Sequence, residues 1–185
     1  MIEKLKNIWM TWVESSYLEG RITTERGLQS NLYAHILREE PDWKVYVEPG
    51  FYPPDGMTAQ YKPDLVICDS RNILAIIEIK FVPHHYPQYI SDLDKMIDIS
   101  SNVNYREIFL DINQKTGKDA GNKHVITRET NFVFMVIGQD DAAACDPKCI
   151  TDYLSRKALE NPFWLFYGKI KSENDPAFGI EKIGS

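Results

Sequence analysis

The sequence is short of cysteine, of long apolar runs and of positive charge, and each shortage excludes a class of protein. Its 185 residues include three cysteines, an odd number without the pattern of a disulfide framework. Residues Met1–Lys4 begin no signal-peptide apolar run, and no stretch approaches the length of a membrane span. We therefore expect a protein of the reducing cytoplasm with no membrane partner.

Familiar phosphate and zinc motifs are also missing. The chain has no glycine-rich phosphate loop and no Cys/His finger. Cys145 and Cys149 have only Asp146 nearby as a further ligand, and a zinc site would need two more. The net charge of −6 argues against a surface built for strong nonspecific nucleic-acid binding. A local basic channel is compatible with that charge, so any DNA affinity should be modest and sensitive to salt.

What the chain does have is the composition of one globular domain. Apolar residues make up 43% of the sequence and charged residues 26%, which is enough for a sizeable core. No internal repeat or inter-domain linker interrupts residues 1–185. A single domain is expected.

The chain is organised around the stretch Tyr61–Phe81, YKPDLVICDSRNILAIIEIKF. Leu65–Cys68 is an apolar strand, Asp69–Asn72 is rich in turn-forming residues, and Ile73–Phe81 is a second strand. Both strands are apolar enough to be buried on two faces. The pattern predicts a hairpin inside a sheet.

Three charged residues interrupt this apolar hairpin. Glu78 and Lys80 point to the same face because side chains alternate along a strand. Closure about the turn brings Asp64 opposite Ile77–Glu78. Two close carboxylates repel unless a cation sits between them, and hard oxygen ligands suit Mg²⁺. The alternative interpretation is a partly buried ion pair between Lys80 and an acid, since an isolated buried charge is expensive.

The motif Pro63-Asp64, thirteen intervening residues and Glu78-Ile79-Lys80 resembles the PD-(D/E)xK nuclease superfamily. The resemblance implies that Asp64, Glu78 and the backbone carbonyl of Ile79 bind Mg²⁺ or Mn²⁺. It also implies that Lys80 positions or activates the attacking water. Members of the superfamily often dimerise, so a homodimer is a further expectation.

Two more acids are candidate catalytic residues. In the resembled superfamily the first core helix often supplies an acidic or amide residue, which makes Glu25 a candidate and Gln29 a weaker one. The alternative is that Glu25 only favours the N-terminus of its helix electrostatically. Glu48 ends the first expected strand and could approach Asp64, or it could be a solvated edge carboxylate.

Apolar periodicity predicts the remaining elements. The expected helices are Ile2–Tyr17, Glu25–Glu39, Tyr89–Ile99 and Cys149–Glu160, and the further strands are Asp42–Pro49, Phe132–Gly138, Phe163–Tyr167 and Phe178–Ile183. The segment Asn102–Asn113 fits a strand or a helix. From about residue 23 to residue 138 this order resembles the αβββαβ core of the restriction-endonuclease-like fold. We expect the α/β class, with a mixed sheet, an extra N-terminal helix and C-terminal additions.

Basic residues outside the motif are candidates for nucleic-acid contacts. Lys95 lies with Asp92, Asp94 and Asp98 on the expected outer face of its helix, where it could reach a nucleic-acid backbone or simply be solvated. Gln114–Thr130 is the most basic stretch and is predicted as a flexible phosphate-contacting loop or as a surface insertion. The candidate contacts in that stretch are Lys115, Lys118, Lys123 and Arg128.

Two histidines follow the motif directly. His84 and His85 stand in the loop after Lys80, where they could contact phosphate, assist proton transfer or simply be exposed.

These observations predict a Mg²⁺- or Mn²⁺-dependent nuclease that acts on DNA, with RNA as the alternative polymer. The competing interpretation is a binding module on the same fold without turnover. The net acidity of the chain and the lack of a sequence-reading motif favour that second interpretation.

Overall fold

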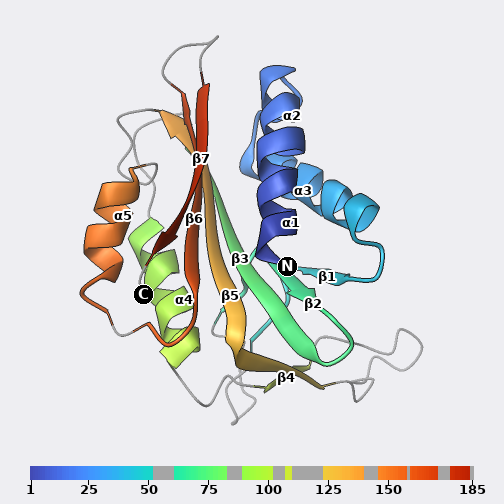
Figure 1. Cartoon of the computed structure of the whole chain (residues 1–185), viewed down its shortest axis with the longest axis vertical. Coiled ribbons are helices and arrows are strands. Elements are labelled where there is room, and N and C mark those ends of the chain that lie inside the picture. Colours follow the sequence, from blue (N-terminus) through green and yellow to red (C-terminus); the bar gives the residue numbers. More distant parts are fainter. Residues whose placement is uncertain are drawn as a thin grey trace.

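The computed structural model describes residues 1–51, 61–82, 89–101, 107–109, 123–139, 146–157, 159–170 and 176–183 (Figure 1). Its helices are α1 (Ile2–Asn7), the π-helical segment η1 (Ile8–Val13), α2 (Glu14–Leu18), α3 (Glu25–Glu39), α4 (Tyr89–Ser101) and α5 (Pro147–Leu154). Its strands are β1 (Lys44–Val47), β2 (Leu65–Cys68), β3 (Asn72–Val82), β4 (Glu107–Phe109), β5 (Lys123–Gln139), β6 (Phe163–Ile170) and β7 (Pro176–Ile183).

A mixed sheet runs through the middle of the molecule. Its strands follow the order β1-β2-β3-β5-β6-β7, and β4 pairs with the first residues of β5. The first three strands form an antiparallel meander, β5 is parallel to β3 and to β6, and β7 returns antiparallel. The α/β class with a mixed sheet is therefore confirmed, and so is the predicted hairpin of β2 and β3.

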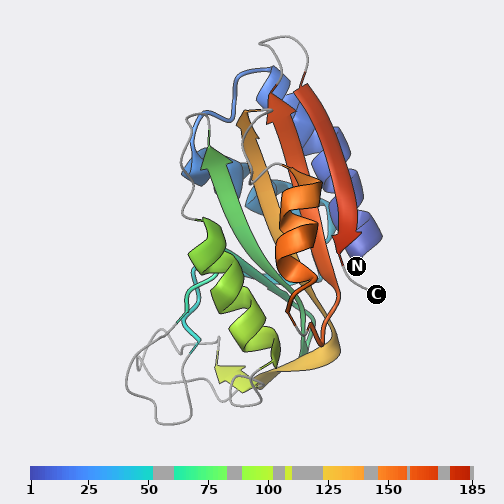
Figure 2. The ribbon, with the colours of Figure 1, turned by 90° about the vertical axis from the view of Figure 1, so that its left-hand side faces the viewer.

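Helices cover both faces of the sheet. The segment from α1 to α3 lies on one face, and α4 and α5 lie on the other (Figures 1 and 2). Leu32 of α3 packs in a cluster with Ile77, whereas Met96 of α4 packs in a second cluster with Ile76. Successive side chains of a strand point to opposite faces, so β3 buries apolar residues on both. This double burial explains its almost continuous apolar sequence.

Helix α3 has the bounds that its sequence predicts. The Thr24 hydroxyl caps it by accepting a hydrogen bond from the Gly27 N–H at 3.0 Å. Leu28, Leu32 and Ile36 recur every four residues and are fully buried. The cap and this apolar stripe fix the position of the first turn of α3 relative to the sheet.

The N-terminal helical segment extends from residue 2 to residue 18, close to the prediction, but its middle is π-helical. Trp9 in that middle is fully buried, with ring centroids 6.0 Å from Phe166 and 5.6 Å from Phe178. Core packing is therefore the role of Trp9.

The prediction of a loop over Gln114–Thr130 is wrong from Lys123 onward, where β5 begins. The pairing of β5 with β3 is irregular here. The Thr130 hydroxyl donates to the Ile73 carbonyl at 2.7 Å and accepts from the Thr127 N–H at 2.9 Å. The Thr130 side chain thus replaces hydrogen bonds between the two strands. This irregular part of β5 is rich in polar residues, and for that reason the sequence pattern predicted a loop.

Smaller differences concern the ends of elements. Helix α5 begins at Pro147, after an Asp146 cap, and ends at Leu154 rather than Glu160. The undecided segment Asn102–Asn113 contains the short strand β4. No helix among the described residues is long and apolar enough to cross a membrane. Five residues of interest lie outside the described ranges: His84, His85, Lys115, Lys118 and Cys145.

Replacing Thr24 with alanine should destabilise the protein by about 1 kcal/mol, because the Gly27 N–H at the start of α3 loses its acceptor. Urea denaturation of the wild type and the variant measures this change. Thr23→Ala is the matched control, since Thr23 is an exposed neighbour outside the cap and its loss should cost less than about 0.5 kcal/mol. Equal losses in the two variants would contradict the assigned cap.

Candidate active site

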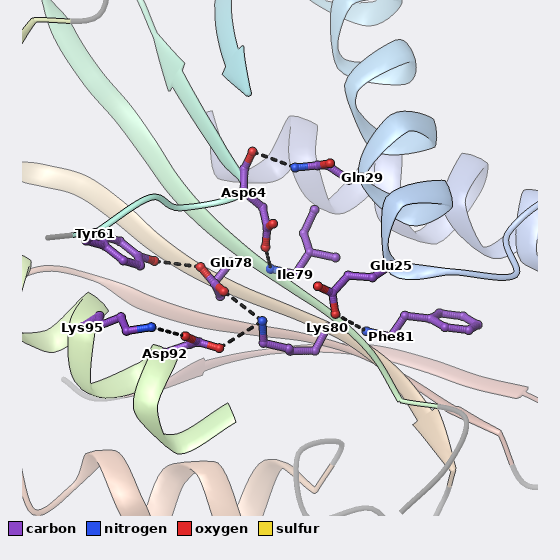
Figure 3. A network of polar contacts seen from close by, with 10 residues as sticks. All are labelled: Glu25, Gln29, Tyr61, Asp64, Glu78, Ile79, Lys80, Phe81, Asp92 and Lys95. Atoms are coloured by element: carbon purple, nitrogen blue, oxygen red, sulfur yellow. Dashed lines mark hydrogen bonds and ion pairs between the residues drawn. The ribbon is translucent and has the colours of Figure 1, made fainter. Parts of the chain in front are cut away.

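The candidate site lies where β3 extends beyond its neighbour β2. The pairing of these strands ends at Leu65 opposite Ile77, whereas β3 continues to Val82 and stays paired with β5 on its other side. One edge of β3 is therefore open to side chains from Glu78 onward. Asp64 stands immediately before β2, at the place where this open edge begins (Figure 3).

Two carboxylates take the place of a strand partner at this edge. The N–H of Ile79 donates to Asp64 Oδ2 at 2.6 Å, and the N–H of Phe81 donates to Glu25 Oε2 at 3.3 Å. Residues two apart in a strand present their N–H groups on the same edge, and the C=O of each residue leaves by that edge too. The carbonyl of Ile79 therefore faces the side on which Asp64 and Glu25 lie.

The backbone of Asp64 is fixed as well as its side chain. Its carbonyl accepts hydrogen bonds from Gln29 Nε2 at 3.0 Å and from the Glu48 N–H at 3.0 Å. Gln29 and Glu25 are one helical turn apart on α3, so both side chains reach the site from one flank of the helix. The structure thus brings Glu25 and Gln29 to the predicted place.

A chain of polar contacts runs from Glu78 along the face of the sheet that α4 covers. The hydroxyl of Tyr61 donates to Glu78 Oε2 at 2.9 Å, and Lys80 Nζ donates to Glu78 Oε1 at 2.9 Å. Lys80 Nζ also lies 3.0 Å from Asp92 Oδ2, and Lys95 Nζ lies 2.8 Å from Asp92 Oδ1. Glu78 and Lys80 share one face, as their spacing predicts, and α4 supplies the second acid (Figure 3).

Burial and like charge shape the acidity of the two motif carboxylates. Burial raises the pKa of Asp64 to about 7, and the charge of Glu78 adds to the rise, against the opposing hydrogen bond from Ile79. Burial also raises the pKa of Glu78, although the Lys80 ammonium limits that rise. Two neighbouring acids that both resist ionisation indicate a site with too little positive charge nearby.

The charges around Lys80 act in the opposite direction. Burial by itself would lower the pKa of the Lys80 ammonium, but Glu78 and Asp92 raise it above its ordinary value. Burial would raise the pKa of Asp92, but hydrogen bonds from Lys95 and Lys80 hold it below its usual range. Lys80 and Asp92 are therefore both charged at neutral pH.

The oxygen atoms at the edge of β3 fit a hard divalent cation. Asp64 and Glu78 offer carboxylate oxygens, and Ile79 offers a main-chain carbonyl on the same edge, which is a donor set suited to Mg²⁺ or Mn²⁺. Within the described ranges no group of three or more His, Cys, Asp or Glu side chains is gathered for a metal ion. Any cation here would be held by two carboxylates, the carbonyl and water.

Other predicted residues are placed differently. The side chain of Glu48 is exposed, and its link to the site is the backbone hydrogen bond to Asp64. Arg128 is exposed and lines a cavity with Asp69 and Asn72, at the opposite end of β3 from Lys80. Parallel pairing aligns the start of β5 with the start of β3, so Arg128 lies away from the motif, and its contact with nucleic acid stays a prediction.

The two remaining basic candidates have separate outcomes. The backbone of Lys123 pairs with Phe109 of β4, at the same distant end of the sheet as Arg128. Lys95 is close to the site through Asp92, and its side chain is 48% exposed. Contact between Lys95 and a nucleic acid stays a prediction that this exposure permits.

Sequence reasoning missed two contributors to the site. Asp92 was expected on the outer face of its helix, but its side chain is only 17% exposed and contacts Lys80. Its spacing of four from the buried Met96 was an available signal. Tyr61 is buried and stands two residues before the motif, but a tyrosine before a strand carries no specific signal for a bond to Glu78.

Comparison of the chain with protein-family models, with curated proteins and with solved structures gave no match.

The raised pKa of Asp64 predicts a pH-dependent stability. The folded protein keeps this proton up to about pH 7, whereas the unfolded chain loses it near pH 4, so this group destabilises the fold as the pH rises from about 4 to 7. Asp64→Asn should therefore stabilise the protein by roughly 2 kcal/mol more at pH 8 than at pH 4. Chemical denaturation across this pH range measures the difference.

Asp69→Asn is a control that should change stability with pH in the opposite direction. Asp69 accepts the backbone N–H groups of Arg71 and Asn72, which outweigh its slight burial and lower its pKa. Its stabilising effect is present at neutral pH and is lost as the pH falls through its folded pKa. A parallel response of the Asp64 and Asp69 variants would contradict the assignment of Asp64.

Proposed function

We propose that the protein is a Mg²⁺- or Mn²⁺-dependent nuclease that hydrolyses phosphodiester bonds, with DNA as its substrate. The observation that carries the proposal is the open edge of β3, where Asp64, Glu78 and the Ile79 backbone lie together with Lys80 alongside. Metal-dependent hydrolysis of a phosphodiester uses oxygen ligands for a divalent cation and a positively charged donor beside them, and this site has both kinds of group.

The order of elements gives a second line of support. From α3 through β1, β2, β3 and α4 to β5, the chain follows the αβββαβ order of the restriction-endonuclease-like core. The antiparallel meander, the parallel β5 and the helices on opposite faces are compatible with that core. The fold of a protein does not fix its activity, so the proposal depends on the site and not on this order.

Each residue of the site has a separate role in the proposed reaction. Asp64 and Glu78 hold the divalent cation, and the Ile79 carbonyl is the third protein ligand. A bound Mg²⁺ or Mn²⁺ supplies Lewis-acid polarisation of the phosphate and lowers the pKa of a bound water. Lys80 donates hydrogen bonds that orient the attacking water or a phosphate oxygen. Glu25 and Gln29 keep the β3 edge and Asp64 in place.

The electrostatics of the chain limit how it binds a polyanion. The net charge is −6, so contact with nucleic acid must be local and should weaken steeply with salt. Among the candidate basic residues that the structure describes, Lys95 is the exposed cation closest to the site. Cleavage of DNA and of RNA at low salt separates the proposed substrate from its alternative.

Nuclease activity is tested by incubating plasmid, single-stranded DNA and RNA with the protein and Mn²⁺ at low salt. Asp64→Asn and Lys80→Met should each reduce cleavage roughly 100-fold or more, because they remove a metal ligand and a donor to the reacting groups. Lys157→Met is the matched control, since Lys157 also pairs with an acid but lies outside the site. Cleavage that survives in the Asp64 and Lys80 variants would indicate a different site or a contaminant.

One observation favours a second function, a non-catalytic binding module on the same fold. Lys80 already has two acidic partners at 2.9 and 3.0 Å, so its charge is compensated by protein groups, and Glu78 has a cationic partner without any metal. Such a network could be purely structural, because a buried cation needs partners whether or not it takes part in a reaction.

Calorimetry with Mn²⁺ separates the two functions. A competent site should release heat, and at pH 6.5 it should release about half a proton or more per ion, because Asp64 has a pKa of about 7 and must ionise to bind. Titrations in two buffers of different ionisation enthalpy give the proton count. Asp64→Asn should abolish both signals and Asp69→Asn should preserve them. Absence of heat in the wild type would favour the binding module.

A further inference from the structure

Lys80 is held from two directions. Its Nζ lies 2.9 Å from Glu78 on its own strand and 3.0 Å from Asp92 on α4. A lysine side chain has four rotatable bonds and loses considerable entropy when it is fixed. Glu78 lies on the same strand as Lys80 and holds the ammonium at one point only. Asp92 adds a second point from a separate element, so the ammonium is confined between the sheet and the helix.

Asp92 is itself oriented. Its two carboxylate oxygens are divided between two lysines, with Oδ1 2.8 Å from Lys95 and Oδ2 3.0 Å from Lys80. Lys95 is three residues further along α4, so this pair forms on one helix face. Rotation of the carboxylate would break one of the two contacts. The ammonium of Lys95 thus keeps Oδ2 directed at Lys80.

We propose that Asp92 is a positioning residue that fixes the Lys80 ammonium beside Glu78, with Lys95 orienting the Asp92 carboxylate. The catalytic consequence rests on the nuclease function proposed above, whereas the positioning itself does not. Asp92 acts through Lys80, and no contact of Asp92 with Asp64 or Ile79 is needed for this role.

The arrangement assigns a chemical role to Lys80. The charged groups that act on it include Glu78 on β3, Asp92 on α4, Glu25 on α3 and Asp64 before β2. Lys80 therefore serves as a fixed hydrogen-bond donor and positive charge beside these carboxylates.

The positioning is tested on Lys80 itself, without any assay of activity. Nuclear magnetic resonance of ¹⁵N-labelled lysine side chains follows the exchange of the Lys80 ammonium protons with water. Asp92→Asn should speed this exchange about fivefold or more, because one of the two carboxylates that hold the ammonium is lost. Asp92→Glu keeps a carboxylate at this position and should hold the exchange rate within about twofold of the wild type.

Asp94→Asn is the matched control. Asp94 is on the same helix and also loses an ion pair, with Lys157 at 3.1 Å, but its partners lie away from Lys80. Its replacement should leave the Lys80 signal unchanged. An unchanged Lys80 signal in Asp92→Asn, or an equal change in both asparagine variants, would overturn the proposal. If Asp92→Asn does not fold, proton exchange at Lys80 that is about fivefold faster in Asp92→Glu than in the wild type would do the same.

Kinetics then separates this inference from the proposed function. Asp92→Asn should lower kcat about tenfold, with KM and Mn²⁺ affinity within about twofold of the wild type, since Asp92 is not a ligand. Unchanged kcat with faster proton exchange at Lys80 would overturn the catalytic consequence of the positioning. If proton exchange at Lys80 becomes faster as expected but the wild type cuts no substrate, the positioning stands and the nuclease function fails.

Discussion

The unequal lengths of β2 and β3 are the constraint on which the candidate site depends. A buried strand edge with unpaired N–H groups costs free energy unless something accepts its hydrogen bonds. Beyond Ile77 no residue of β2 is left to do so, and the carboxylates of Asp64 and Glu25 accept instead. The unpaired N–H groups of β3 thus bind acids from two separate elements, which come to lie at one place. Together with burial, that concentration of negative charge shifts the pKa values of Asp64 and Lys80.

Charges of alternating sign follow from this concentration. Glu78 is buried next to Asp64 and resists ionisation, and Lys80 compensates for part of the excess charge. Lys80 in turn is balanced by Asp92, and Asp92 by the more exposed Lys95. The chain of contacts therefore runs from the middle of the sheet to solvent along α4. Asp64 stands at the start of this chain of contacts, and its pKa is raised to about 7. A divalent cation beside Asp64 would therefore stabilise its ionised form.

Much of the fold was predictable because the relevant signals are local. The bounds of α3 follow from a cap and an apolar stripe, and the hairpin of β2 and β3 follows from two apolar runs around a turn. The start of β5 was not predictable in this way, since Thr130 replaces backbone hydrogen bonds with a side chain. The position of Arg128 was not predictable for a related reason: the parallel pairing of β5 with β3, a long-range property, decides which end of the sheet it occupies.

The sequence by itself determined the shared face of Glu78 and Lys80 and their opposition to Asp64, because strand alternation and hairpin register are geometric consequences of short stretches. It also determined that Glu25 and Gln29 lie on one flank of a helix. Only the tertiary structure decided that Asp92 and Tyr61 join the site, and that Glu48 contributes its backbone rather than its side chain. The packing of α4 on the sheet and the course of the chain before β2 set those contacts. The helical spacing of Asp92 and Met96 indicates a buried flank of α4 but not its partner on the sheet, and the chain before β2 has no periodic pattern.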